Sequence, residues 1–448
     1  MRRISLRTFA FGLTSVIAGA TLGSAGGAGP ASAWPSARMA PASAGDYVAI
    51  VKISALGTAS VGGEIDQLVG GAGTPQRVAN FHASSAGTVV TALVRVTGPS
   101  DVFRAVTWGP STVGSFSFTR TSLNDVVRGT KLTTPTNADV ILHGVNGNDL
   151  MTIPTDISTL YSWTNARVVR VLVNECQWLP YFKNAYSPAY RQQVISTVAA
   201  ATASGGTAIL DLHYACHDDP AAPVMLPYTS QIGPDTHSVA FWADAASLFG
   251  NNPSVMFELF NEPKMGRLDI EPDGHTGAQT WRDGGQLQAG TATWYSPGMQ
   301  ALYDTVRASG ANNLVLIDGT GWASNLLTAG TNPVDGTNIA YAFHAYAPAG
   351  TDPSVYPANL DRSVAPVIDP NGRYREAGFA TEFGTNAQDT PAAATGSSYL
   401  ASTIAWLDAH HVGWAVYGWY PRTIDSYGLL TWWPLWGTSR TQPVLAAF

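Results

Sequence analysis

The chain has little charge of either sign and almost no lysine. Only 12% of its 448 residues are charged, with Lys+Arg 24 against Asp+Glu 31. This weakly acidic, apolar-rich balance is typical of a folded chain rather than a disordered one. The lysines are scattered at Lys52, Lys131, Lys183 and Lys264. With no polybasic run to contact phosphates or anionic lipids, the sequence predicts neither a nucleic-acid partner nor a membrane-surface partner.

Cysteine is scarce as well, since Cys176 and Cys216 are the only two. A disulfide-built scaffold needs more of them, whereas a chain of this length can bury a sufficient core without any. Length also favours one large domain with a smaller one beside it.

Long apolar runs are missing except near the N-terminus, where residues 9–22 follow Arg2, Arg3 and Arg7. The run is broken by glycines and is short for a bilayer span, so a membrane anchor is the weaker alternative. Ala31-Ser32-Ala33 then offers a cleavage site. We expect a signal peptide over residues 1–33 and a secreted, extracellular protein without a membrane partner after cleavage. The export route and the cleavage site stay open.

Residues 34–45 are expected to form a linker, and residues 46–130 a small β-sandwich. Short runs rich in Val, Ile, Phe and Thr alternate here with Gly, Ser and Pro. The expected strands are 47–53, 88–96, 102–108 and 115–119. The aromatic residues are expected in the core: Phe81, Phe103, Trp108, Phe116 and Phe118. Residues 56–64 are loosely similar to the opening of carbohydrate-binding modules, so sugar binding is the alternative to a spacer role.

Residues 131–448 show apolar β runs that alternate with helical segments, the pattern of an α/β fold. The runs are 140–145, 168–173, 208–212, 255–260, 314–317, 339–343, 378–381 and 412–417. Eight such units predict a (β/α)8 TIM barrel. A doubly wound open sheet is the competing fold, but no G-x-G-x-x-G follows the first run.

Polar residues end many of these runs, and in a TIM barrel the strand ends form the active face. Glu262 ends the fourth run and Glu382 ends the seventh, so both carboxyls are expected to face one cleft. A lone glutamate would be read more simply as a helix-start or salt-bridge acid. A facing pair instead favours retaining glycoside hydrolysis, in which one carboxylate attacks and the other donates a proton.

Here the chain resembles glycoside hydrolase family 5, the cellulase and mannanase family of retaining (β/α)8 enzymes, from about residue 137 to the end. Its sharpest motif is Asn261-Glu262-Pro263 closing a β run. The resemblance implies that Glu262 is the acid/base, that Glu382 is the nucleophile and that Asn261 binds the sugar hydroxyl next to the anomeric carbon. It also places Arg170, His213, His344, Tyr346 and Trp419 on the family's remaining active-site positions.

Elementary chemistry suits these roles. Arg170 can stabilise an ionised Glu382, and Tyr346 can donate to the same carboxylate. His213 and His344 are expected to bind sugar hydroxyls, and Trp419 to offer a flat face to a pyranose ring. The simpler alternative to sugar binding is that these histidines and the tryptophan are buried in the core.

The segment 213–219 contains His, Cys and Asp residues that would suit zinc, but its spacing matches no zinc motif. Cys216 is better explained by a disulfide with Cys176, because both follow neighbouring strands at the same end of the barrel. We therefore expect no metal and no cofactor. Glu175 is expected to face solvent rather than substrate.

Tryptophans outside the strands are candidate aromatic subsites: Trp178, Trp322, Trp432 and Trp433, with Trp281 and Trp436 as further possibilities. The sequence thus predicts a secreted retaining β-glycoside hydrolase, and the family resemblance implies that it acts on β-glucan in the manner of an endoglucanase or cellulase. The alternatives are a β-mannanase, an exo-acting β-glycosidase and a non-catalytic carbohydrate-binding protein. The expected partner is a β-linked glycan and the expected state a monomer, while endo or exo action stays open.

Overall fold

The structure is a computed structural model, and it describes part of the chain. The described residues are 36–39, 45–54, 61–71, 75–83, 89–98, 100–107, 112–121, 126–128, 130–133, 138–147, 155–203, 205–216, 232–290, 292–346, 356–384, 393–418 and 442–448. The predicted signal peptide and the residues Trp419, Trp432, Trp433 and Trp436 lie outside these ranges. Within them, no helix combines the length and apolarity needed to cross a bilayer.

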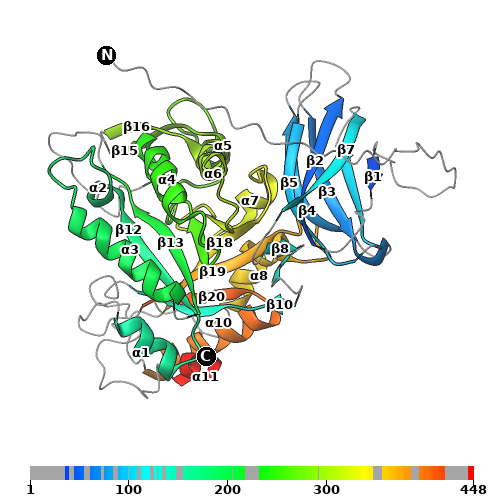
Figure 1. Ribbon diagram of the computed structural model, residues 1–448. Helices are drawn as coiled ribbons and strands as arrows, with labels where there is room; N and C mark the ends of the chain where they lie inside the picture. The colour runs from blue at the N-terminus through cyan, green and yellow to red at the C-terminus, as the bar shows by residue number, and fades with distance from the viewer. Residues whose placement is uncertain are drawn as a thin grey trace, which may run out of the picture. The chain divides into compact units, whose positions relative to one another are not determined.

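Two antiparallel sheets form the N-terminal β-sandwich (Figure 1). One sheet has the order β1 (Ser36–Met39), β6 (Val102–Thr107), β3 (Val61–Leu68) and β4 (Gln76–Ala83). The other has the order β5 (Val89–Val96), β2 (Gly45–Ser54) and β7 (Thr112–Thr121). The predicted sandwich is confirmed. Residues 34–45 were expected to be a linker, but they contain strand β1. This segment is a strand because it pairs with β6.

Alternate residues of the sandwich strands fill its core, as the period of two in a strand requires. Tyr47, Ala49 and Val51 of β2 are buried together with Phe103 and Ala105 of β6. Phe116 and Phe118 pack against this cluster, with the Phe103 and Phe118 ring centroids 5.1 Å apart. These aromatics are therefore core residues, as predicted. The side chains of Phe81 and Trp108 lie outside the described part of the structure.

A small antiparallel sheet follows, with the order β10 (Asp139–Val140), β9 (Lys131–Thr133) and β8 (Val126–Arg128). It extends across the predicted domain boundary at residue 130 and leads directly into the barrel.

A closed barrel of eight parallel strands forms the rest of the fold. The strands are β11 (His143–Asn146), β12 (Val168–Asn174), β13 (Thr207–Tyr214), β14 (Val255–Glu258), β17 (Val315–Asp318), β18 (Ile339–Tyr346), β19 (Ala377–Gly384) and β20 (Gly413–Val416). Each coincides with one of the predicted runs, and β20 closes the barrel by pairing with β11. The predicted TIM barrel is confirmed.

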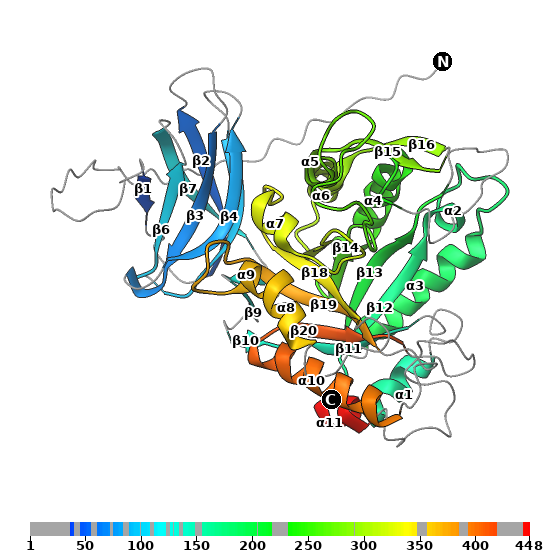
Figure 2. The same cartoon turned by 180° about the vertical axis from the view of Figure 1, so that it is seen from behind.

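Helices connect the strands and cover the outside of the barrel (Figure 2). They are α1 (Thr155–Trp163), α2 (Glu175–Trp178), α3 (Pro188–Ala203), α4 (Thr236–Phe249), α5 (Gly277–Asp283), α6 (Gly298–Ala308), α7 (Leu327–Thr331), α8 (Pro357–Ser363), α9 (Ala365–Ile368), α10 (Ala393–Ala409) and α11 (Gln442–Ala447). A hairpin, β15 (Gly285–Ala289) and β16 (Ala292–Ser296), lies between α5 and α6. Capping boxes start α4 at Asp235 and α5 at Thr276.

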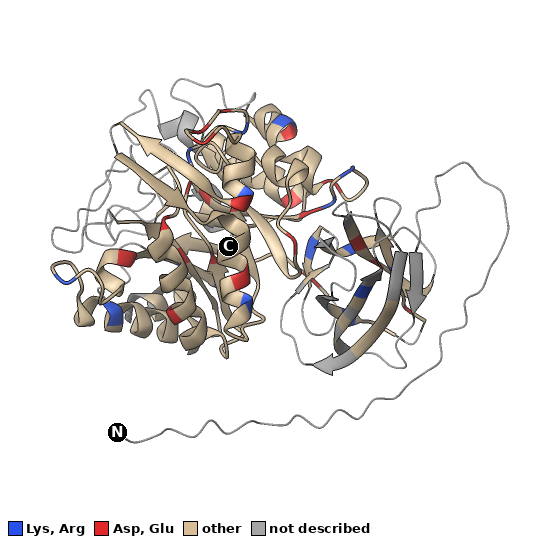
Figure 3. Cartoon of the chain, turned by 90° about the horizontal axis from the view of Figure 1, so that it is seen from above, with Lys and Arg blue, Asp and Glu red and all other residues tan. Residues whose placement is uncertain are grey.

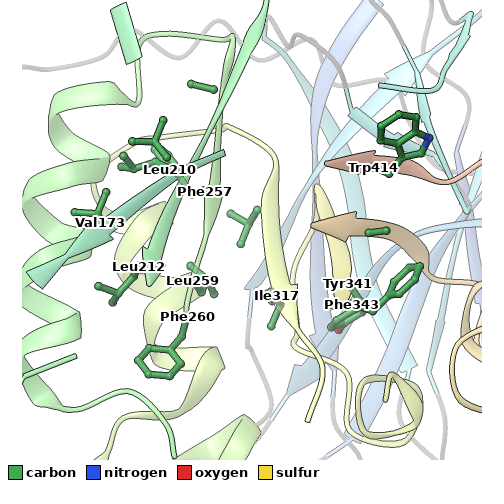
Figure 4. Packing of buried hydrophobic residues seen from close by; sticks show 14 of the residues in the cluster. Val173, Leu210, Leu212, Phe257, Leu259, Phe260, Ile317, Tyr341, Phe343 and Trp414 are labelled. Carbon is green, nitrogen blue, oxygen red and sulfur yellow. The ribbon is translucent and has the colours of Figure 1, made fainter. Parts of the chain in front are cut away.

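Outward-facing strand residues pack against these helices in the main core (Figure 4). On β12, for example, Val169, Val171 and Val173 belong to this core, whereas Val168 belongs to a separate cluster. That second cluster includes Ile209, Met256 and Leu316, and we call these three residues with Val168 the inner apolar layer.

Two residues further along the same strands, each of these positions is followed by a charged residue. We call this set the inner polar layer: Arg170, Asp211, Glu258 and Asp318. All four are fully buried. Charged residues elsewhere lie along helices, loops and sandwich strands (Figure 3), and some of them form ion pairs, such as Arg77 with Glu376 and Arg282 with Asp335.

Candidate active site

Glu262 and Glu382 lie at the carboxyl end of the barrel and are almost fully buried, with 6% and 5% of their surface exposed. A carboxylate oxygen of Glu262 and one of Glu382 lie within 4.8 Å of each other, and a ring nitrogen of His344 lies within the same limit of both. Retaining glycosidases hold their two carboxyls about 5–5.5 Å apart and inverting ones about 6.5–9.5 Å apart. The structure thus brings the two predicted catalytic carboxyls together in one site, as a pair that shares one glycosidic bond requires.

Glu382 accepts hydrogen bonds on both oxygens. Arg170 donates from Nη1 to Oε1, and the Tyr346 hydroxyl donates to Oε2 at 3.0 Å. Burial, then the charge of Glu382, raises the pKa of Tyr346 well above its usual value, so the phenol keeps its proton. Both contacts match the prediction and suit an ionised carboxylate that is oriented for attack.

His344 lies between the two glutamates. Its Nδ1 is 2.8 Å from Glu262 Oε1 and 3.6 Å from Glu382 Oε2. Burial lowers the pKa of His344, but the charge of Glu382 and the contact with Glu262 outweigh it and raise the pKa above its ordinary value. The ring therefore lies between the two acids, and its contact through Nδ1 fixes the Glu262 side chain.

Arg170 connects Glu382 to several other buried polar side chains. It donates from Nε and Nη2 to Glu258 at 2.6 and 3.0 Å, and from Nη2 to Asn261 Oδ1 at 2.8 Å. The same Nη2 lies 3.0 Å from Asp211 Oδ2. Burial alone would lower the pKa of Arg170, yet Asp211, Glu258 and Glu382 raise it well above its usual value. The guanidinium thus stays charged in a dry site, where a partnered cation is tolerated.

His213 contacts Asp211, with Nδ1 2.7 Å from Oδ2. Burial and then the Arg170 charge lower the pKa of His213 to about 4, so the ring is neutral near pH 7. Its predicted contact with a sugar hydroxyl stays a prediction.

Sequence reasoning missed the roles of Asp211, Glu258, Asp318 and Asn146. Asn146 accepts from Arg170 at 2.9 Å and donates to the Thr381 carbonyl at 2.9 Å, which ties β11 to β19. A signal was present, because a charged residue at an inward position of an otherwise apolar strand needs a buried partner.

The predicted disulfide between Cys176 and Cys216 is present, with the Cα atoms 5.7 Å apart. It joins the segments that follow β12 and β13. Because Cys216 is bonded to Cys176, the zinc alternative for residues 213–219 loses its thiolate.

The expectation that Glu175 faces solvent is wrong. Glu175 is fully buried and accepts from the Cys216 peptide N–H at 2.8 Å and from the Ser238 hydroxyl at 3.1 Å. Burial, then the charge of Asp235, raises the pKa of Glu175 well above its usual value. The buried carboxyl therefore connects Cys216, one half of the disulfide, to Ser238 in the first turn of α4.

Trp178 was expected as an aromatic subsite, and this is also wrong. It is fully buried, it stacks edge-on with Phe241, and its Nε1 donates to Asp244 at 2.8 Å. Trp281 is likewise buried and donates to the Asp318 carbonyl. Core packing of indoles against amphipathic helices explains both.

Trp322 instead keeps 49% of its surface exposed. Its peptide N–H donates to the carbonyl of Pro263, the residue after Glu262, at 3.1 Å. An exposed indole so close to the acid/base position is compatible with the predicted subsite.

Two groups of possible metal ligands occur among the described residues: Glu258, Asp318 and His344, and Glu262, His344 and Glu382. Glu258 already has Arg170 as its cation. Metal-free catalysis stays our prediction.

Similar proteins point in the same direction. Endoglucanase N of Pectobacterium atrosepticum is 27% identical over 223 residues, which are 50% of this chain and 39% of that protein. Endoglucanase A of Evansella cellulosilytica is 25% identical over 231 residues, 51% of this chain and 38% of that protein. The matched region is thus well under two thirds of either relative.

Among solved structures, a β-glucanase from Saccharophagus degradans matches with a TM-score of 0.54 and 18% identity, covering 73% of this chain and 95% of that one. An endocellulase from Pyrococcus horikoshii gives 0.53 and 15%, covering 72% and 98%. These likenesses show the barrel fold. Residues 133–422 match the family described as cellulase, glycosyl hydrolase family 5, and the chain belongs to that family.

Proposed function

We propose that the protein hydrolyses β-linked glucan with retention of anomeric configuration, with Glu382 as nucleophile and Glu262 as acid/base. The observation that carries the proposal is the pair itself: two buried carboxylates within 4.8 Å, each with different partners. Glu382 is held by the donors Arg170 and Tyr346. Glu262 Oε1 instead lies 2.8 Å from Nδ1 of His344.

In the first step, an oxygen of Glu382 attacks the anomeric carbon while Glu262 gives its proton to the leaving glycosidic oxygen. The bond from the anomeric carbon to that oxygen breaks, and a glycosyl ester of Glu382 forms. Tyr346 and Arg170 keep the attacking carboxylate in place, so the reaction begins from an oriented nucleophile.

In the second step, Glu262 removes a proton from water, which attacks the same carbon and displaces Glu382 as a carboxylate. The esterified Glu382 carries no charge, so the field on His344 and Glu262 alternates between the steps. That alternation is what allows one carboxyl to act first as an acid and then as a base.

The β-glucan substrate is inferred from relatives. The similar curated proteins are named endoglucanases, and the β-glucanase from Saccharophagus degradans was solved in complex with cellotetraose. Trp322 provides an exposed indole on which a pyranose could stack. A β-mannanase or an exo-acting β-glycosidase would use the same pair, since loops rather than the pair select the sugar. Secretion, inferred from residues 1–33, belongs to the same proposal.

The experiment compares the protein with Glu382→Gln and Glu262→Gln on β-glucan, mannan, xylan and xyloglucan, with reducing ends as the readout. We expect β-glucan to be cleaved fastest and each variant to lose at least about a hundredfold in kcat. Cleavage of mannan alone would instead support the β-mannanase alternative. Binding of β-glucan without cleavage by the unaltered protein would favour the non-catalytic alternative and contradict the proposal.

Azide separates the two roles. With Glu262→Ala and an activated aryl glycoside, azide can attack the glycosyl ester of Glu382 without a base, which gives a β-glycosyl azide. With Glu382→Ala, azide can replace the nucleophile from the other face, which gives an α-glycosyl azide. The reversed pair of products would exchange the two assignments.

A further inference from the structure

Asp318 ends strand β17 and is fully buried at the carboxyl end of the barrel. Its Oδ2 accepts the peptide N–H of Glu262 at 2.9 Å, so a side chain on β17 holds the main chain of the turn that follows β14. The Asp318 carbonyl accepts from the buried indole of Trp281 at 2.9 Å, which anchors the aspartate backbone. The role proposed above gives Asp318 no part in the reaction.

The second oxygen of Asp318 has an unusual environment. Oδ1 is buried and has no hydrogen-bond donor among the described residues. A carboxylate oxygen of Glu258 and a nitrogen of His344 lie within 4.8 Å of an Asp318 oxygen, with His344 Nε2 3.8 Å from Oδ2. Two buried carboxyls side by side cannot both be ionised without a large cost, so one of them must hold a proton.

Arg170 decides which one. It donates twice to Glu258, which makes Glu258 the anion, whereas the ion-pair partner that the described residues offer Asp318 is the His344 ring, 3.8 Å away and beyond hydrogen-bond distance. The pKa directions agree. Burial raises the pKa of Glu258, but Arg170 outweighs it and the pKa is lowered overall. Burial, then the charge of Glu258, raises the pKa of Asp318 well above its usual value.

We propose that Asp318 is a positioning residue that acts as a neutral carboxylic acid, with its proton shared with Glu258 and its Oδ2 holding the peptide N–H of the acid/base Glu262. This inference rests on the proposed function, because it takes Glu262 as the acid/base. Asp318 touches neither the substrate nor the reacting atoms.

Glu262 needs such a support because its backbone is strained. Its φ is 50°, the left-handed region that costs a side-chain-bearing residue about 1–2 kcal/mol. The hydrogen bond from its N–H to Asp318 fixes the main chain, and the contact with His344 fixes the side chain. Without Asp318, the buried N–H would lose its partner and the peptide would be free to relax, which moves the carboxyl away from the leaving oxygen.

The test uses Asp318→Asn and Asp318→Leu in the full chain. Asparagine can accept the Glu262 N–H with its oxygen and donate to Glu258 with its NH₂, as the neutral acid does, so it is the matched control. Leucine has a similar size and can do neither. Each is assayed on two substrates: a β-glucan, whose leaving group needs protonation, and an aryl β-glycoside with an acidic phenol, whose leaving group does not.

We expect Asp318→Leu to lose about a hundredfold in kcat/KM on β-glucan and far less on the aryl glycoside, with Asp318→Asn restoring most of the loss. An equal loss on both substrates would overturn the positioning role in favour of a structural one. So would the failure of asparagine to restore β-glucan cleavage.

A pH profile tests the neutral state even if Asp318→Leu does not fold. Because an amide replaces a neutral acid, the alkaline limb of kcat/KM should coincide in Asp318→Asn and the unaltered protein. If Asp318 were an anion, its replacement would remove a negative charge beside Glu262 and shift that limb to lower pH, which would contradict the proposal.

Glu262→Gln, assayed on the same two substrates, separates this inference from the proposed function. If Glu262→Gln shows the leaving-group dependence and Asp318→Leu does not, only the role of Asp318 fails. If Glu262→Gln shows none, the acid/base assignment itself fails.

Discussion

The inner apolar layer and the inner polar layer lie on the same barrel strands, two residues apart, and both are buried. Val168, Ile209, Met256 and Leu316 make the first, and Arg170, Asp211, Glu258 and Asp318 follow them one for one. The apolar layer needs nothing except close packing. The polar layer places the carboxyls of Asp211 and Glu258 against the Arg170 guanidinium and the carboxyl of Asp318 beside Glu258, so it exists only as a connected set.

In this barrel, a connected set of charges makes part of the buried core into a site. Burial of unpaired charge costs several kcal/mol for each ion, and the structure offsets that cost by connecting charges rather than by exposing them. Arg170 is the shared partner, and a proton on Asp318 removes one negative charge. The same connections reach upward to Glu382, Asn261 and Glu262.

Among the variants considered, Arg170→Met should have the largest effect on stability and activity, because it keeps the volume of the side chain and removes the cation. We expect the free energy of unfolding to fall by about 3–5 kcal/mol, because buried carboxylates lose their partner, and glucan cleavage to become undetectable. Ile209→Val in the apolar layer is the control and should cost about 0.5–1.5 kcal/mol. Urea denaturation measures both, and similar losses in the two variants would mean that the layers do not differ in kind.

The disulfide tests how far the polar layer depends on the segments beyond it. The Cys176→Ser/Cys216→Ser variant opens a link between residues 40 apart in sequence and should lower the free energy of unfolding by about 2–4 kcal/mol. Because Arg170, Glu258 and Asp318 keep their contacts, kcat on β-glucan should fall far less than in Arg170→Met. A loss of activity without a loss of stability would place the disulfide inside the catalytic arrangement.

His213 should make the polar layer sensitive to acid. Its pKa is lowered from 6.5 to about 4 in the folded state by burial and by Arg170, so the unfolded chain binds the proton first. Its contribution is present in full above pH 6.5 and is lost as the pH falls towards 4, by about 1.4 kcal/mol per pH unit. The charged and titratable groups around the ring are Arg170, Asp211, Glu262, His344 and Glu382.

Denaturation of the unaltered protein and of His213→Gln across that interval measures the effect. The stability of His213→Gln should fall less steeply with acid, since glutamine has no proton to bind. Parallel curves would contradict the assignment of a neutral, buried His213.

Trp322 should give the smallest effect, because it lies outside both layers. Trp322→Ala removes one exposed stacking face and should lower kcat/KM on β-glucan about fivefold, equivalent to about 1 kcal/mol. Product lengths from cello-oligosaccharides provide the second readout. Unchanged kinetics and products would exclude Trp322 as a subsite.

Much of the barrel fold and of the site is predictable from sequence. All eight barrel runs are apolar and bounded, and the Asn261-Glu262-Pro263 motif identifies its strand end. The sandwich was harder: β3 contains Gly62, Gly63, Glu64 and Asp66, so its composition argues against a strand although its pairing with β4 and β6 makes one.

Errors came where burial depends on partners far away in sequence. Glu175 is buried because Cys216 and Ser238 satisfy it, and Trp178 because α4 covers it. Asp318 belongs to no sequence motif. An acid inside an apolar strand predicts only that it has a partner, while the partners themselves, Glu258 and Glu262, lie on a neighbouring strand and in the turn after it. Such long-range pairs cannot be inferred from local pattern.

A retaining reaction on Glu262 and Glu382 is tested by the anomer first released from a β-glucan oligosaccharide, followed by proton NMR before mutarotation. We expect the β-anomer from the unaltered protein and no release from Glu382→Gln. An α-anomer as the first product, or undiminished release from Glu382→Gln, would contradict the retaining reaction.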